Sequence, residues 1–270
     1  MDSIFCKEEA LLDGLLHRLE PVDPFISRII CYPWEKCKEL EERIRIMRSY
    51  GVKGLLNYGG VTIDKGMHII GKGYSSIVVL SCINGVYTPI VLKIRRLDSR
   101  RKSLEYEGII LDYLSSSNYT PALYFWTRDF IAMEYINGLS LEKFIQQTIV
   151  SDRAFLLKTL IKIISSSYFF DLLGIDHTEL NRPYGHVFVT KKGYPVYLDW
   201  ESARIRRKPH NLTMIASYLF IRSRYSEKIL EILNIEKDHI INHLHRYKND
   251  PTTEYLWLIK LVRKAYQRLV

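Results

Sequence analysis

The stretch 174–203 reads GIDHTELNRPYGHVFVTKKGYPVYLDWESA. Its second half predicts a β-hairpin, with strands at 187–189 and 195–198 around a turn that ends in Gly193. Because a tight hairpin brings its outer ends together, we expect His186 and Asp199 to be neighbours, with Glu179 on the preceding loop. An imidazole and two carboxylates on rigid strands suit metal binding and base catalysis. A lone aspartate at a strand end more often belongs to a turn.

Length and composition predict a chain with a buried core. The 270 residues are 47% hydrophobic, enough for one large or two modest domains. The longest apolar stretch, 155–173, is interrupted by Lys158, Lys162 and Asp171, which predicts a buried helix rather than a membrane span. The first residues lack a basic region followed by an apolar run, so we expect no secretory signal. These features predict a protein without membrane association.

The four cysteines are scattered, at Cys6, Cys31, Cys37 and Cys82. None belongs to a C-x-x-C pair, so we expect neither a zinc knuckle nor a disulfide framework. This cysteine pattern favours a reducing cytoplasm.

The formal net charge of +9 favours an anionic partner, such as a nucleotide, a nucleic acid or an acidic protein. A moderate excess spread along the chain more often serves solubility. One local concentration follows Asp199, at Arg204, Arg206, Arg207 and Lys208. A nucleic-acid-binding regulator is therefore kept as the least favoured function.

Residues 1–65 predict a small, mainly helical extension. Apolar residues recur at helical spacing in 8–19 and again in 36–50, and Pro21 and Pro24 are expected to end the first of these helices. A winged-helix DNA-binding module is the less favoured alternative, because no recognition helix is apparent.

A strand pattern begins at Met67. The strands 67–70 and 77–81 flank a loop with the pattern G-x-G-x-x-S, formed by Gly71, Gly73 and Ser76. Two glycines let the backbone approach a phosphate, whose oxygens accept from exposed N–H groups. Most such loops are ordinary hairpin turns, and the strand that follows argues against a Rossmann site.

A lysine and a glutamate lie at positions expected to be buried. Lys93 lies within the apolar strand 90–94, and Glu107 falls on the apolar stripe of a helix predicted over 101–114. A buried carboxylate is costly unless it is paired. We therefore predict a Lys93–Glu107 ion pair.

The second half of the chain is predicted to be mainly helical. A strand at 130–136 precedes helices at 155–170, 213–221, 227–233 and 254–269, and Asn211 is expected to cap the second of these helices.

The order of these motifs resembles the protein-kinase-like fold over residues 67–223. It is most similar to the archaeal atypical serine/threonine kinases, which are related to Rio-type and lipopolysaccharide-type kinases. The resemblance implies an α+β bilobal fold, with a helical extension (1–65), a β-rich N-lobe (66–136) and a helical C-lobe (137–270). It also implies ATP as phosphate donor, Mg²⁺ or Mn²⁺ as the metal, and a protein substrate.

The resemblance assigns roles by motif. Lys93, held by Glu107, would contact the α- and β-phosphates, Asp199 would hold the metal, and Glu179 would orient and deprotonate the acceptor hydroxyl. The remaining nucleotide contacts would come from the glycine loop, the adenine-flanking side chains and the hinge backbone, namely Gly71, Gly73, Ser76, Val78, Val91, Glu134 and Ile136.

Several positions depart from the family pattern. Glu179 replaces the usual aspartate, and His186 aligns with the usual asparagine ligand, after a two-residue insertion. Mg²⁺ prefers oxygen ligands, whereas Mn²⁺ tolerates imidazole. D-F-G is replaced by D-W-E, and the segment from Asp199 to Asn211 is too short for a peptide-binding platform. Two alternatives therefore stay open, a small-molecule kinase of the sugar or aminoglycoside type and a nucleotide-binding pseudokinase scaffold.

Overall fold

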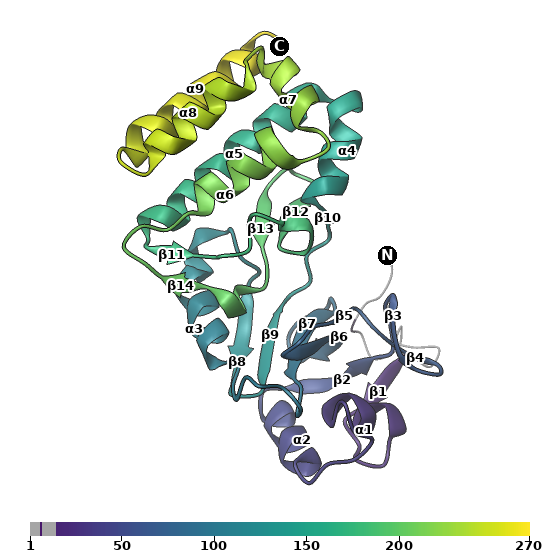
Figure 1. Cartoon of the computed structure of the whole chain (residues 1–270). Helices are drawn as coiled ribbons and strands as arrows, with labels where there is room; N and C mark the ends of the chain where they lie inside the picture. Colours follow the sequence, from purple (N-terminus) through teal and green to yellow (C-terminus); the bar gives the residue numbers. More distant parts are fainter. Residues whose placement is uncertain (1–5, 7–14) are drawn as a thin grey trace. The chain divides into compact units, whose positions relative to one another are not determined.

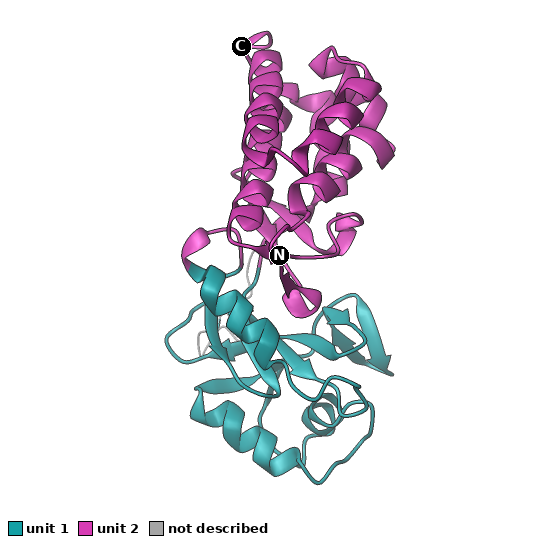
Figure 2. Cartoon of the chain, turned by 60° about the vertical axis from the view of Figure 1, so that its left-hand side comes forward, with its two compact units in different colours: residues 1–115, 121–135 teal, residues 116–120, 136–270 magenta. Residues whose placement is uncertain are grey.

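The computed structural model describes residues 6 and 15–270, which form a mixed α+β structure (Figure 1). The chain divides into two compact units (Figure 2). The first comprises residues 1–115 and 121–135, and the second comprises 116–120 and 136–270. The predicted α+β class is confirmed.

An antiparallel sheet organises the first unit. Among the described residues it has seven strands, in the order β1-β2-β6-β7-β9-β8, with β5 paired to β6. The strands are β1 (Leu16–Arg18), β2 (Val52–Leu56), β5 (Gly71–Lys72), β6 (Ser76–Ile83), β7 (Ile90–Arg95), β8 (Leu123–Trp126) and β9 (Phe130–Glu134). A separate ribbon pairs β3 (Val61–Asp64) with β4 (Met67–Ile69).

Two helices share one hydrophobic core with the sheet. Helix α1 (Pro24–Ile30) contributes Ile26 and Ile29, and α2 (Leu40–Ser49) contributes Met47. The sheet contributes alternate residues of its central strands, including Ile77, Val79, Ile90, Leu92, Ile94, Phe130 and Ala132. Because side chains alternate across a strand, Lys93 lies on the opposite face of the sheet.

The prediction of a separate helical extension over 1–65 is wrong. Strands β1 and β2 belong to the same sheet as β6 and β7. The helix predicted over 8–19 falls largely outside the described residues, and its last part forms β1. Pro24 begins a helix instead of ending one, since proline fits the first helical turn and Asp23 accepts a hydrogen bond from the Ile26 amide at 3.0 Å.

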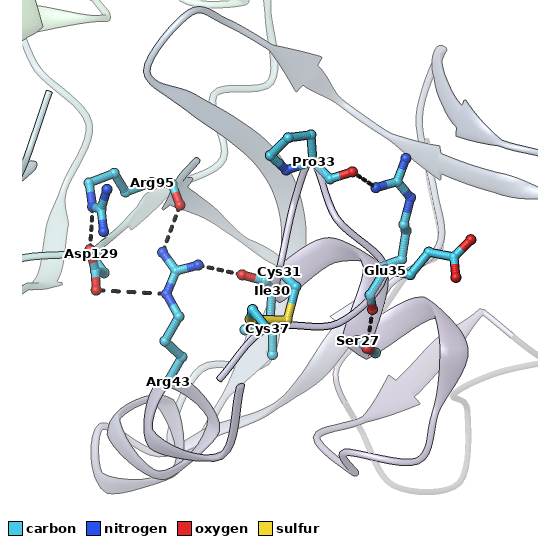
Figure 3. Close-up of a disulfide and its surroundings, with 10 residues drawn as sticks. Ser27, Ile30, Cys31, Pro33, Glu35, Cys37, Arg43, Arg95 and Asp129 are labelled. Carbon is cyan, nitrogen blue, oxygen red and sulfur yellow. Dashed lines mark hydrogen bonds and ion pairs between the residues drawn. A yellow bond between two sulfur atoms is a disulfide. The ribbon is translucent and has the colours of Figure 1, made fainter. Parts of the chain in front are cut away.

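The expectation that the cysteines form no disulfides is also wrong. Cys6 is bonded to Cys82 of β6, and Cys31 to Cys37. The second bond closes the loop between α1 and α2 (Figure 3). Sequence spacing identifies metal knuckles but not cysteines that the fold brings together from different elements, so this pairing was missed.

A buried arginine connects the helices to the central strands (Figure 3). Arg43 of α2 donates hydrogen bonds to the backbone carbonyls of Ile30 and Arg95, the latter at 2.6 Å, and its Nε lies 3.7 Å from Asp129. Burial lowers the pKa of Arg43 to about 10, so the guanidinium remains charged at neutral pH. This network fixes the end of β7, two residues after Lys93.

The second unit is mainly helical. Its helices are α4 (Leu141–Ser151), α5 (Arg153–Leu172), α6 (Asn211–Ser217), α7 (Ser226–Leu233), α8 (Lys237–Tyr247) and α9 (Pro251–Gln267). Its β-structure consists of β10 (Gly138–Ser140), β12 (Val187–Thr190) and β13 (Pro195–Tyr197), and of the pair β11 (Ile175–Asp176) and β14 (Arg204–Ile205). None of the described helices combines the length and apolar character needed to cross a bilayer.

The predicted hairpin is β12–β13. Val187 pairs with Tyr197 and Val189 with Pro195, and Gly193 takes a positive φ of 72° in the turn, as glycine does readily. The hairpin packs on α5 through Tyr197, whose hydroxyl lies 2.8 Å from that of Ser166. The ends of the hairpin are thus held by the core of the unit.

Candidate functional site

The candidate nucleotide-binding side chains of the first unit lie on the sheet face opposite α1 and α2. Strand register places Gly71 beside Val78, Val78 beside Lys93, and Lys93 beside Ile131. Two residues before Lys93 on β7, Val91 lies beside Met133 of β9. Directly opposed residues of antiparallel strands point to the same side, so these residues form a row across one face.

Lys93 and Glu107 form the predicted ion pair. The Lys93 Nζ lies 2.9 Å and 2.8 Å from the two carboxylate oxygens of Glu107. Their side chains are 7% and 2% exposed, so the pair is buried. Removing either partner of such a pair is strongly destabilising. The prediction that these two residues pair is confirmed.

Gly108 lets α3 (Glu105–Leu114) approach the sheet closely enough for this contact. A Cβ at Gly108 would lie 2.6 Å from Cγ of Trp126 on β8. Atoms so close to the Trp126 backbone have little freedom to move. The absence of a side chain at Gly108 therefore sets the position of its neighbour, Glu107.

The glycine loop forms the turn between β5 and β6. The Gly73 N–H donates to the Ser76 carbonyl at 2.8 Å, which closes the turn. Ser76 is buried, whereas Tyr74 at the tip is 97% exposed. The Gly73 N–H is therefore engaged within the turn.

The hinge positions have some of their backbone groups engaged. The Glu134 N–H donates to the Ala122 carbonyl at 2.8 Å, and the Glu134 side chain accepts from the Ala122 N–H at 3.2 Å. The Ile136 carbonyl accepts from the Gly138 N–H at 3.1 Å. These bonds fix the backbone at the end of β9 and at the start of the second unit.

The second unit brings together the three side chains predicted around the hairpin. The His186 carbonyl accepts from the Leu198 N–H at 2.8 Å, which aligns His186 with Asp199. The His186 Nε2 lies 3.3 Å from a carboxylate oxygen of Glu179. One possible metal-ligating atom from each of Glu179, His186 and Asp199 lies within 4.8 Å of the others. The predicted proximity is confirmed.

This cluster fits a divalent cation by its donor set. Two carboxylates and an imidazole suit Mn²⁺ better than Mg²⁺. The His186 Nδ1 is buried, and none of the described residues offers it a hydrogen bond. A buried nitrogen of this kind needs a partner, which a bound ion or its water ligand can supply.

One residue of the cluster and one residue beside it have left-handed backbones. Asp199 has φ of 65° and Thr178 has φ of 71°. Such a conformation is costly for non-glycine residues, most of all for a β-branched threonine. The Thr178 hydroxyl donates to the Ser202 carbonyl at 3.1 Å, so the two segments support each other. Strain of this kind is typical of functional sites.

Asn211 has a different role from the one predicted. It is the first residue of α6, and its side chain does not cap the helix. Its Oδ1 accepts from the His177 N–H at 2.9 Å, and its Nδ2 donates to Asp171 at 2.8 Å and to the Ile175 carbonyl at 2.6 Å. Asn211 thus holds the loop that presents Glu179, a contact that sequence spacing cannot reveal.

His177 lies fully buried below this loop. Its Nε2 is 3.0 Å from the Leu198 carbonyl, and its ring centroid is 4.6 Å from that of Trp200. Burial lowers the pKa of His177 to about 4. The ring is therefore neutral at pH 7 and acts as a spacer between the Glu179 loop and the segment that carries Asp199.

The basic segment after Asp199 is partly used within the fold. The Arg206 Nε lies 3.2 Å from the buried carboxylate of Asp176, whose other oxygen accepts from the Thr178 N–H at 3.1 Å. Arg204, Arg207 and Lys208 are exposed. Asp176 is a site-supporting residue that sequence analysis did not single out.

Comparison with known proteins identifies one relative of interest. No family model matches the chain. Over 108 residues the chain is 31% identical to "Uncharacterized protein MJ1211" of Methanocaldococcus jannaschii, covering 40% of this chain and 89% of that protein.

The chain belongs to the same family as MJ1211. The name of MJ1211 states no activity, so the relationship places the chain in a family without assigning a reaction.

Proposed function

We propose that the chain is an ATP-dependent phosphotransferase with a bilobal protein-kinase-like fold, of the archaeal atypical serine/threonine kinase type. The first unit would correspond to the β-rich N-lobe and residues 137–270 to the helical C-lobe. The observation that supports this most is the buried Lys93–Glu107 pair. A buried ion pair is weak evidence for stability, because an apolar pair of similar volume often serves as well or better. Charge retained at this position is better explained by binding an anion.

The first unit would bind the nucleotide. Lys93, kept charged and oriented by Glu107, would contact the α- and β-phosphates. Val78 and Val91 share the lysine's face of the sheet and would flank the adenine. The adenine edge would be bound by the Glu134 carbonyl and the Ile136 N–H. The phosphates would be covered by the turn that contains Gly71, Gly73 and Ser76.

The second unit would hold the metal and the acceptor. Asp199 and His186 would bind Mg²⁺ or Mn²⁺, and the bound ion would neutralise charge on the phosphates. Glu179 would orient the acceptor hydroxyl and take its proton. The hydroxyl oxygen then forms a bond to the γ-phosphorus as the bond to the β–γ bridging oxygen breaks, and ADP leaves.

A serine or threonine hydroxyl of a protein is the proposed acceptor, with autophosphorylation included. A small-molecule acceptor is the second candidate, because only β14 and a short 3₁₀ turn, 200–202, lie between Asp199 and α6. This short segment offers little surface for a peptide. Incubation with γ-labelled ATP and a cell extract separates the two, since label enters either protein or the small-molecule fraction.

A cytoplasmic location is part of the proposal, since ATP is the phosphate donor. The two disulfides restrict the kinds of cell in which the protein could be cytoplasmic. Disulfides persist in oxidising compartments and in intracellular proteins of hyperthermophilic archaea and bacteria. A cytoplasmic enzyme with these bonds would therefore be an intracellular protein of a hyperthermophilic archaeon or bacterium.

Nucleotide binding is tested by thermal unfolding. A ligand that binds only the folded protein raises the melting temperature as its concentration rises. We expect ATP to stabilise the protein in the presence of a divalent cation, with Mn²⁺ more effective than Mg²⁺. Stabilisation without phosphate transfer would indicate a pseudokinase scaffold. No stabilisation by any nucleotide with either metal would contradict the proposal.

A further inference from the structure

Arg96 contacts the glycine loop twice. It follows β7 directly, three residues after Lys93. Its backbone N–H donates to the Ser75 carbonyl at 2.8 Å, and its Nη1 donates to the Gly73 carbonyl at 2.8 Å. One residue therefore binds two carbonyls of the turn, in which the Gly73 N–H also donates to the Ser76 carbonyl.

The guanidinium of Arg96 is held in place by two neighbours. Its Nε and Nη2 donate to the two carboxylate oxygens of Asp98 at 2.9 Å and 2.7 Å. Its Cζ lies 5.1 Å from the ring centroid of Tyr32. The bidentate contact with the carboxylate requires the planar fork of arginine, which lysine lacks.

Tyr32 is itself fixed by the fold. It lies in the loop closed by the Cys31–Cys37 disulfide and is 6% exposed. Its carbonyl accepts from the Leu97 N–H at 3.0 Å. The Lys72 Nζ, on the first strand of the glycine hairpin, lies 5.2 Å from the same ring. The Tyr32 ring thus contacts Lys72 of the glycine hairpin and Arg96, which binds the turn of that hairpin.

We propose that Arg96 is a positioning residue for the glycine loop. This inference rests on the proposed nucleotide binding. The Arg96 charge is neutralised by Asp98, so its contribution is to hold the turn in one place rather than to attract phosphate. A loop fixed in advance loses less conformational freedom when a ligand binds, and a glycine turn has much freedom to lose.

The test compares four proteins: the parent, Arg96→Ala, Arg96→Lys and the control Arg100→Ala, which removes an exposed arginine nearby. Two readouts are used, amide hydrogen exchange of residues 71–78 without nucleotide, and titration with a non-hydrolysable ATP analogue and Mn²⁺. We expect both Arg96 variants to exchange faster in this segment and to bind the analogue about five- to tenfold more weakly, as expected for one lost hydrogen bond. The control should match the parent.

Parent-like exchange in Arg96→Ala would overturn the proposal. Parent-like exchange and affinity in Arg96→Lys would also overturn it, because charge alone would then suffice. If an Arg96 variant fails to fold, Asp98→Asn releases the guanidinium while keeping Arg96 and should shift both readouts the same way. Should the parent bind no nucleotide, the proposed function fails, while hydrogen exchange still decides whether Arg96 anchors the turn.

Discussion

The Lys93 ammonium and the Glu107 carboxylate meet in a buried part of the first unit, with both carboxylate oxygens within 2.9 Å of Nζ. The lysine comes from the centre of a sheet and the glutamate from a helix on the sheet face that α1 and α2 leave uncovered. The pair therefore couples the position of α3 to that of β7.

Removing one member of the pair should destabilise the protein more than removing both. Lys93→Met leaves the Glu107 carboxylate buried without its partner, and we expect a loss of about 3–5 kcal/mol in the free energy of unfolding. The double variant Lys93→Met/Glu107→Leu should recover most of this loss. Urea unfolding of the parent, both single variants and the double variant measures the coupling. Additive losses would show that the two residues are not coupled.

Gly108→Ala should displace α3. Alanine favours a helix over glycine by roughly 0.5–1 kcal/mol, but the new methyl group would meet Trp126. Overpacking of this kind costs about 1–3 kcal/mol, so we expect net destabilisation. Gly60→Ala is the control, because a Cβ there meets nothing within 4 Å. A Gly108→Ala protein as stable as the parent in urea would show that α3 can shift freely.

Protonation of His177 should destabilise the protein in acid. Its pKa is about 4 in the folded state, against about 6.5 in the unfolded chain. As the pH falls from 6.5 to 4, the unfolded chain binds a proton that the folded protein does not, so stability falls over this window. Below pH 4 this contribution stays constant. A plot of unfolding free energy against pH should be flatter between 6.5 and 4 for His177→Phe than for the parent, and equal slopes would contradict the assignment.

The two disulfides should differ in their contribution to stability. Cys6 and Cys82 are 76 residues apart, whereas Cys31 and Cys37 are 6 apart. In the chain-entropy description, closing the longer loop contributes about 4 kcal/mol and the shorter about 2 kcal/mol. We expect Cys6→Ser/Cys82→Ser to lower the melting temperature more than Cys31→Ser/Cys37→Ser. Reductant should lower the melting temperature of the parent but not that of the fourfold serine variant, and a parent insensitive to reduction would contradict this.

Sequence patterns predicted the parts of the site that depend on local spacing. Glu107 falls on an apolar helical stripe, and Lys93 in an apolar strand, so burial alone required them to pair. The hairpin was predicted from a glycine turn between two apolar runs, and its geometry brings His186 to Asp199. In both cases the physical requirement lies within a few residues of the side chain.

The missed features depend on contacts between distant segments. Strand β2 is a short run between Gly51 and Asn57, and its pairing with β1 and β6 makes it a strand. Asn211 appeared to be a helix cap, but the fold places it beside His177. The disulfides and the Arg96 contacts likewise join elements that no spacing rule connects. Helix α8 was not predicted, and its mixed polar sequence is buried at only a few positions, including Ile240 and Leu244.

The most direct test of the proposed reaction is phosphate transfer by Asp199→Asn. Asparagine tolerates the left-handed backbone at this position, so the fold should be kept, while the charge that would hold the metal is lost. With γ-labelled ATP and Mn²⁺, we expect the parent to transfer label to an acceptor and Asp199→Asn to transfer at least about a hundredfold less, at an unchanged melting temperature, because the metal supplies several kcal/mol of transition-state stabilisation. Equal transfer by the two proteins, or no transfer by the parent with any acceptor tested, would contradict the account.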